Sequence, residues 1–351
     1  GKIGGILLVM ICLMWCCNTR KTVMELNLVG TSGMKPELVM NGSERVIDVN
    51  EMGYAKLIMQ EGENGYATLR YGKDRIPLFI EDGKSLVVYV YGDHAKGNTR
   101  FEGTGASKTI YLNSLESRNK SFEYELDGEE FLQQLKEHVA EQIYYLDTME
   151  FDEAFKEMER NRIKFSAYTV LENYPLYHAW STGNKDYQLD TSYLDSVKGF
   201  IKEDEKLLVL KEYQEGMASL VSVISTSRLK EYDAYKRVTA QFDYVIHNLT
   251  NSTLIEFLID HYAYNYLLGA GVDEHMGTIL RTYDTYVKDV KMRKRFYDGY
   301  ERCMKIVSGR PAMNFVFTDM AGQAFRLDDF RGKYLFINVW ATWGVPCRAE
   351  N

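Results

Sequence analysis

The chain has 351 residues, more than one typical domain holds, so we expect two or three domains. A hydrophobic content of 45% with only 5 prolines predicts a folded protein rather than a disordered one. The formal net charge of −8, together with the absence of a long basic run, argues against a nucleic-acid partner.

Residues 1–17 have the composition of an export leader. One positive charge precedes an apolar run that is too short to span a membrane comfortably and that ends at Cys17. A bacterial lipoprotein signal would place the acyl chain on Cys17 or Cys16, and Cys17 fits better because Cys16 follows the bulky Trp15. Simple cleavage and an uncleaved anchor are the alternatives. We therefore expect a periplasm-facing protein of the bacterial cell envelope, held at the membrane by a lipid anchor.

Residues 22–115 form the next segment and are rich in short strand-like runs. These runs occur at residues 25–30, 67–71, 76–80 and 86–91. The link at residues 81–84 contains a glycine and predicts a hairpin between the last two runs. Because no helical pattern of useful length appears, the sequence predicts a small antiparallel sandwich or barrel.

A glycine-containing segment at residues 103–109 superficially resembles a phosphate-binding loop. It reads Gly-Thr-Gly-Ala-Ser-Lys-Thr, but the glycine that should directly precede Lys108 is missing. We interpret it as a polar turn between strands and expect no nucleotide or other cofactor.

Residues 116–307 change to a helical pattern. Apolar residues recur at helical spacing at Phe131, Leu135, Val139, Ile143 and Leu146, and residues 254–268 are apolar on a broad face. The most regular stripe consists of Tyr286, Val290, Tyr297, Tyr300, Met304 and Val307. We predict a helical domain whose stripe packs on its own neighbours, with binding of a partner helix as the rarer alternative. Residues 308–311 would end the last helix and form a linker.

Metal-ligand and disulfide patterns are both missing from the body of the chain. The six histidines show no metal-ligand spacing, so we expect no metal site. The adjacent Asp260 and His261 on a helix lack a nucleophile and are interpreted as structural. Outside the leader only Cys303 and Cys347 remain, which excludes a disulfide framework, and Cys303 is expected to be a buried, inert thiol.

The C-terminal stretch carries the most specific motif. An apolar, strand-like run at residues 334–339 is followed by Trp343-Gly344-Val345-Pro346-Cys347. Thiol–disulfide exchange needs a thiolate, and a cysteine at a helix N-terminus in Cys-x-x-Cys has a lowered pKa. The first cysteine of such a pair attacks and the second resolves the mixed disulfide. Here Gly344 stands at the attacking position, Cys347 stands at the resolving position, and Pro346 suits the first turn of a helix.

This stretch resembles the TlpA/ResA-type extracytoplasmic thioredoxin-like proteins, whose motif reads Trp-Cys-x-Pro-Cys. Residues 311–319 are similar to the opening strand of that group, residues 320–323 to its turn, and residues 325–333 to its run into the central strand. The resemblance implies a thioredoxin fold and exchange with disulfide-containing client proteins or a redox partner. It also identifies Trp343, Gly344, Pro346 and Cys347 as the site.

Residues 310–351 cover only the start of such a domain, so we expect a truncated thioredoxin-like segment. Without the remaining strands and helices it should be poorly packed, or borrow contacts from the helical domain. The predicted fold class is therefore α+β and multidomain: an antiparallel β-domain, a central helical domain and a partial thioredoxin-like βα segment.

Three functions are compatible with this sequence. The first is membership of the envelope thiol-disulfide oxidoreductase family, with dithiol exchange lost in this chain. The second is a non-enzymatic envelope lipoprotein whose β-domain and helical domain bind a partner. The third, which ranks lowest, is a single-thiol protein that uses Cys347 for mixed disulfides or metal capture; a cysteine at the resolving position is usually shielded.

Overall fold

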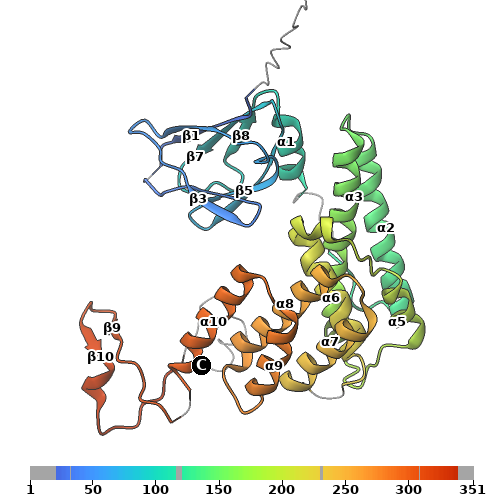
Figure 1. The fold of residues 1–351 in the computed structure, drawn as a ribbon, viewed down its shortest axis with the longest axis vertical. Coiled ribbons are helices and arrows are strands. Elements are labelled where there is room, and N and C mark those ends of the chain that lie inside the picture. The colour runs from blue at the N-terminus through green and yellow to red at the C-terminus, as the bar shows by residue number, and fades with distance from the viewer. Residues whose placement is uncertain (1–20, 32, 116–120, 230–231, 308, 339–351) are drawn as a thin grey trace, which may run out of the picture. The chain divides into compact units, whose positions relative to one another are not determined.

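A computed structural model describes residues 21–338 except residues 32, 116–120, 230, 231 and 308. The chain divides into two compact units, Gly1–Leu220 and Val221–Asn351. Figure 1 shows that the first unit begins with strands and continues with helices, and that the second unit consists of helices followed by a short hairpin.

The strands of the first unit form a sandwich of two four-stranded sheets. One sheet has the order β4-β1-β7-β8 and the other the order β3-β2-β5-β6. The first comprises β1 (Val23–Val29), β4 (Tyr54–Ile58), β7 (Ser85–Tyr91) and β8 (Thr99–Glu102). The second comprises β2 (Glu37–Met40), β3 (Ser43–Val46), β5 (Gly65–Tyr71) and β6 (Asp74–Ile80). Alternate residues of both sheets, among them Leu26, Leu69, Leu78 and Val88, meet in one apolar core.

Two expectations for this sandwich were wrong. Strands β1 and β7 pair in parallel, so the domain is not purely antiparallel. The runs at residues 76–80 and 86–91 do not form a hairpin, because β6 pairs with β5 whereas β7 pairs with β1 and β8. Both runs bury alternate side chains in the same core, so the link between them crosses from one sheet to the other. Alternation along a strand does not say which sheet the strand joins.

A helix replaces the polar turn that was predicted at residues 103–109. Helix α1 (Ala106–Ser114) begins directly after Gly105 and packs against β6. Its Thr109 side chain is fully buried, accepts a hydrogen bond from the Phe79 N–H at 2.9 Å and donates to the Phe79 carbonyl oxygen at 3.3 Å. Tertiary contacts of this kind stabilise a nine-residue helix that its own sequence pattern does not reveal.

The helices of the first unit follow the β-sandwich. They are α2 (Gly128–Asp147), α3 (Glu153–Tyr168), α4 (Tyr174–Thr182), α5 (Thr191–Lys198) and the first part of α6 (Lys211–Thr226), with short 3-10 turns η2 (Thr169–Glu172) and η3 (Glu205–Val209). The boundary between the units falls within α6, after Leu220. Asp127 and Asp152 cap α2 and α3 by accepting backbone N–H groups of the first turn. The predicted stripe on α2 is confirmed, since Phe131, Leu135, Val139 and Leu146 are buried and Ile143 is half-buried.

The second unit has α8 at its centre. Its helices are α7 (Ala234–Asn248), α8 (Ser252–Ala270), α9 (Met276–Tyr286) and α10 (Val290–Met304), and α7, α9 and α10 all pack on α8. The broad apolar face predicted for residues 254–268 is confirmed by the burial of Leu254, Leu258, Ile259 and Leu267. In the part of the chain that the structure describes, no helix combines the length and apolar character needed to cross a bilayer.

The regular stripe predicted near α10 is not its buried face. Val290 is 79% exposed, whereas Phe296 is fully buried and Gly299 packs within contact distance of Tyr264. The remaining stripe residues are only half-buried, namely Tyr286, Tyr297, Tyr300, Met304 and Val307. A small residue lets two helices approach closely without adding to an apolar pattern, so the pattern indicated the wrong face.

Candidate functional site

The segment that leads into the C-terminal motif forms a short hairpin. Strands β9 (Val316–Thr318) and β10 (Ala324–Arg326) pair antiparallel, with Phe317 opposite Phe325. The side chain of Asp319 closes the turn by accepting the N–H groups of Ala321 and Gln323, each at 2.9 Å. The 3-10 turn η4 (Leu327–Phe330) follows. A strand and a turn therefore lie where the resemblance places them, although β9 is shorter than the run at residues 311–319.

The residues after this hairpin do not form the strand that was predicted. Residues 334–338 have no regular secondary structure, and Phe336 is 92% exposed. Phe317, Phe325 and Phe330 contact one another through their rings, yet Phe317 is exposed and the other two are only half-buried. The expectation of poor packing is confirmed for residues 310–338. An apolar run becomes a strand only where a neighbour pairs with it, and none of the described residues does so.

The residues assigned to the exchange site lie outside the described residues. These are Trp343, Gly344, Pro346 and Cys347, and the lipidation candidates Cys16 and Cys17 also lie outside. Cys303, by contrast, lies on α10, is half-buried, and has its Sγ 3.8 Å from the carbonyl oxygen of Leu267. Cys303 is therefore less buried than expected.

The pair Asp260 and His261 does not form a catalytic dyad. Asp260 is almost fully buried, accepts the Tyr283 hydroxyl at 2.9 Å and forms an ion pair with Arg295. Burial raises the pKa of Asp260, although Arg295 and Tyr283 act in the opposite direction. His261 is instead 3.0 Å from the Asn265 side chain. Among the described residues no group of three His, Cys, Asp or Glu side chains is placed to hold a metal ion.

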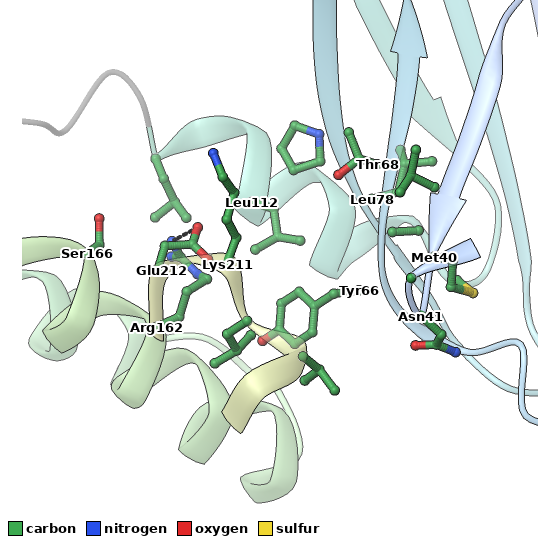
Figure 2. Close-up of a pocket in the computed structure, with 17 residues that line it drawn as sticks. Met40, Asn41, Tyr66, Thr68, Leu78, Leu112, Arg162, Ser166, Lys211 and Glu212 are labelled. Carbon is green, nitrogen blue, oxygen red and sulfur yellow. Dashed lines mark hydrogen bonds and ion pairs between the residues drawn. The ribbon is translucent and has the colours of Figure 1, made fainter. Parts of the chain in front are cut away.

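A hollow in the first unit was not anticipated from the sequence. It has a volume of about 450 Å³ and is lined by residues of β2, β5, β6, α1, α3, η3 and the start of α6. Figure 2 shows Tyr66, Arg162, Lys211 and Glu212 around it. We call it the Arg162 pocket.

A buried charge network forms one wall of the Arg162 pocket. Glu159 is fully buried and accepts the Tyr66 hydroxyl at 2.7 Å and the Arg162 Nε at 2.8 Å. Arg162 also reaches Glu212 at 3.5 Å, the interaction dashed in Figure 2. Tyr66 and Glu159 are 93 residues apart, so no local sequence pattern could have indicated their contact.

The electrostatics of this network favour a structural role. Burial opposes the charge on Arg162, but Glu159 and Glu212 outweigh it and raise the pKa of the guanidinium. Burial and the Glu159 carboxylate likewise raise the pKa of Tyr66, which keeps its hydroxyl protonated. The described residues that line the pocket include no thiol and no imidazole. The lining of the Arg162 pocket thus combines apolar residues with charged ends, a combination suited to binding a ligand.

Comparison with known proteins gives short matches to one kind of enzyme. The chain is 46% identical over 55 residues to the thiol-disulfide oxidoreductase ResA of Bacillus cereus, a match that covers 15% of this chain and 32% of the relative. It is 47% identical over 45 residues to ResA of Geobacillus kaustophilus, with 13% and 26% covered, and 44% identical over 45 residues to ResA of Bacillus subtilis, with 13% and 25% covered.

These relatives are matched only in part. The chain spans about a third of the length of the first curated relatives. No family model matches it, and no solved structure matches it significantly. Over the stretch that is matched, the comparisons support a ResA-like family of thioredoxin-type thiol-disulfide oxidoreductases.

Proposed function

We propose that this chain is an envelope protein of the ResA-like thiol-disulfide oxidoreductase family in which dithiol exchange has been lost. The observation that carries the proposal is Gly344 in the sequence Trp-Gly-Val-Pro-Cys, at the position of the attacking cysteine. The lengths of the matches to the ResA proteins are close to that of residues 310–351, where the motif lies. A relative with both cysteines would exchange disulfides with client proteins or with a redox partner.

The chemistry of exchange explains why one residue decides the activity. In a Cys-x-x-Cys motif the attacking thiolate forms a mixed disulfide with the client, and the second thiol displaces the client to leave an internal disulfide. Gly344 supplies no sulfur for the first step. If Cys347 attacked in its place, the mixed disulfide would have no neighbouring thiol in the motif to resolve it, so release of the client would depend on an external thiol.

The packing of the preceding residues supports the same conclusion. A reactive motif needs its helix N-terminus held against a sheet, so that backbone N–H groups stabilise the thiolate. Residues 334–338 are not part of a sheet, and Tyr334 and Phe336 are exposed. We therefore expect that restoring the missing cysteine does not restore the site.

Insulin reduction with dithiothreitol as electron donor tests this proposal. The purified chain is expected to give the rate of the protein-free blank, and Gly344→Cys is expected to stay near that rate because the supporting sheet is not formed. Cys347→Ser serves as the thiol control and should not differ from the unaltered chain. Rescue by Gly344→Cys alone would show that residues 310–351 build a more complete site than we propose.

The second candidate function is partner binding by the β-domain and the helices. The Arg162 pocket favours it, because the hollow combines apolar residues such as Met40 and Leu78 with the charged ends of Lys211 and Glu212. Cys347→Ser separates partner binding from a function of the remaining motif thiol, because only the binding function survives this substitution. Retained complex formation under reducing conditions would favour binding.

We also propose that the chain is exported and lipid-anchored through Cys17 or Cys16. The apolar run that ends in these cysteines supports this placement. Labelling of bacterial cells with an alkyne-bearing fatty acid should mark the protein, and Cys17→Ser should abolish the label if Cys17 is the acylated residue. A label that is unchanged in the Cys16→Ser and Cys17→Ser double variant would contradict the proposal.

A further inference from the structure

A second hollow of the first unit lies at one end of the β-sandwich. It has a volume of about 780 Å³ and is lined by the turn between β5 and β6, by β6, by the loop between β7 and β8, by β8 and by the second half of α1. We call it the basic cleft, because four of its lining residues are cations: Lys73, Arg75, Lys96 and Arg100. It shares only Pro77 and Leu112 with the Arg162 pocket.

The charge of the basic cleft is opposite to that of the whole chain. The chain has a formal net charge of −8, whereas the cleft has four cations and a single carboxylate, Asp74. That carboxylate accepts the N–H groups of Ala95 and Lys96 at 2.7 and 3.3 Å and so holds the loop between β7 and β8 in place. Asp74 therefore shapes the cleft, and the net charge around the hollow stays positive.

Two of the cations are not paired with a carboxylate. Arg100 forms an ion pair with Glu102. Lys73 and Arg75, by contrast, make no ion pair within the described residues, and both are exposed. Arg70 lies directly opposite Arg75 in the β5–β6 ladder and is itself paired with Glu37 and Glu44. The cleft therefore presents two exposed cations close together in sequence and near a defined strand edge.

The edge of β6 adds a main-chain donor beside these cations. Helix α1 covers this edge at two positions, through Thr109 on Phe79 and through the Asn113 side chain, which donates to the Pro77 carbonyl oxygen at 2.7 Å. Main-chain groups of an antiparallel strand alternate between its two edges, so Arg75, two residues before Pro77, has its N–H on the same edge. The Arg75 N–H and side chain are then both available to one anion.

Apolar surface lies next to the charged residues. Ile110 of α1 is 50% exposed, Pro77 is exposed and Phe101 of β8 is half-buried, and all three line the cleft. Exposed apolar surface beside unpaired cations is suited to a ligand with an anionic head and an apolar body, since each part of the ligand then has a matching surface.

We propose that the basic cleft binds a small organic anion, with its phosphate or carboxylate group at Lys73 and Arg75 and its apolar body against Ile110 and Pro77. A phosphate or carboxylate accepts hydrogen bonds from a guanidinium in bidentate geometry, and the main-chain N–H of Arg75 supplies a further donor. This binding function does not depend on Gly344, Cys347 or any thiol. Anion binding by the basic cleft goes beyond the proposed family function. Its test can succeed or fail whether or not dithiol exchange has been lost.

Calorimetric titration of the intact chain with 2-naphthyl phosphate tests the proposal. Inorganic phosphate and 2-naphthol represent the two halves of this probe, and each is expected to bind more weakly than the whole. The double variant Lys73→Gln/Arg75→Gln should weaken binding of 2-naphthyl phosphate by about tenfold or more, because charge-assisted hydrogen bonds are lost. Rising salt should also weaken it.

A matched control uses two exposed cations of the same domain outside the cleft. Lys35→Gln/Arg45→Gln removes the same net charge and should change the affinity by less than about twofold, since distant surface charges are screened. Urea unfolding verifies that both double variants stay folded. Equal losses in the two double variants would overturn the proposal, as would tight binding of 2-naphthol or no binding of 2-naphthyl phosphate.

A further experiment distinguishes a lipid headgroup from a soluble molecule as the anion that the cleft binds. Sedimentation with vesicles of phosphatidylcholine, with and without phosphatidylglycerol, reports whether a lipid headgroup reaches the cleft. Binding to anionic vesicles that is lost in Lys73→Gln/Arg75→Gln would support the site and assign its anion to a lipid. Binding of 2-naphthyl phosphate without vesicle binding would support the site and assign it to a soluble anion.

Discussion

At the scale of single residues, Lys108 shows how a charge can be part of a core. Its side chain is only 8% exposed and forms ion pairs with Glu81 at 3.1 Å and with Asp152 at 2.6 Å. Its Nζ also lies 4.8 Å from the ring centre of Phe79 and 4.9 Å from that of Phe155. Because Asp152 also caps α3, Lys108 connects helix α1 to the start of α3.

Replacing Lys108 should therefore destabilise the protein. Lys108→Met leaves the nearly buried Glu81 with less compensation and should lower the free energy of unfolding by about 3 kcal/mol. Lys84→Met is the matched control, because Lys84 also contacts Glu81, at 2.7 Å, but its side chain is 44% exposed. This substitution should cost about 0.5 kcal/mol. Urea unfolding at neutral pH measures both values. Similar losses of unfolding free energy in the two variants would contradict the role of Lys108 as a charge in the core.

The ion pair between Lys108 and Asp152 predicts that the stability of the protein depends on pH. The hydrogen bond from Lys108 holds the pKa of Asp152 below its ordinary value. A carboxylate with a lowered folded-state pKa contributes stability above its ordinary pKa, and this contribution is lost as the pH falls through the lowered value. The difference in the free energy of unfolding between the unaltered chain and Lys108→Met should thus be constant from pH 7 to about pH 5 and shrink below about pH 4. A difference that grows on acidification would contradict this.

The role of a single residue can be inferred from the sequence when its partners lie in the same short motif. Gly344 is visible in the sequence because the motif around it has fixed spacing. Lys108 was interpreted as part of a polar turn, because its partners Glu81 and Asp152 are 27 and 44 positions away (108 − 81 and 152 − 108). Glu159 and Tyr66 escaped notice for the same reason.

At the scale of elements, α1 protects the open edge of β6. Thr109→Val keeps the shape of the side chain but leaves the Phe79 N–H without its acceptor, which should cost about 1–2 kcal/mol. Thr285→Val is the control, because the Thr285 hydroxyl is exposed and bonds only to the Arg281 carbonyl oxygen of its own helix. It should change the free energy of unfolding by less than about 0.5 kcal/mol. No difference between the two variants would argue against edge protection.

The contact of α3 with α6 depends on the absence of a side chain at Gly216. A Cβ atom there would lie 2.4 Å from the Phe165 carbonyl oxygen and 2.9 Å from the Phe165 Cβ. Gly216→Ala should therefore destabilise the protein by about 2–3 kcal/mol. Gly269→Ala on α8 meets nothing within 4 Å and should instead stabilise it by up to about 1 kcal/mol through helix propensity. Thermal unfolding distinguishes the two signs, and a stabilised Gly216→Ala variant would contradict the packing.

Periodicity predicted the elements better than it predicted their partners. The α2 stripe was placed correctly because large apolar residues alone define its buried face. The α10 stripe was not, because Gly299 and Phe296 provide the contact. Four of the eight strands of the sandwich, β1, β5, β6 and β7, were located from the sequence. The parallel pairing of β1 with β7 is a long-range choice that alternation leaves open.

At the scale of the whole molecule, the hollows and the family resemblance lie in different parts of the chain. The first unit holds the Arg162 pocket and the basic cleft, and no sequence motif indicated either of them. The C-terminal stretch carries the family resemblance, yet its residues up to 338 include the most exposed large apolar side chains that the structure describes. The family resemblance therefore lies where the described residues are least packed, whereas the two proposed binding sites lie where no motif is present.

The rate of insulin reduction by the intact, unaltered chain tests the central claim most directly. The chain and an intact Cys-x-x-Cys thioredoxin-type protein are compared at equal concentration with dithiothreitol as donor. Because Gly344 provides no attacking thiolate, we predict a rate equal to the protein-free blank. A rate comparable to that of the Cys-x-x-Cys protein would contradict the loss of dithiol exchange.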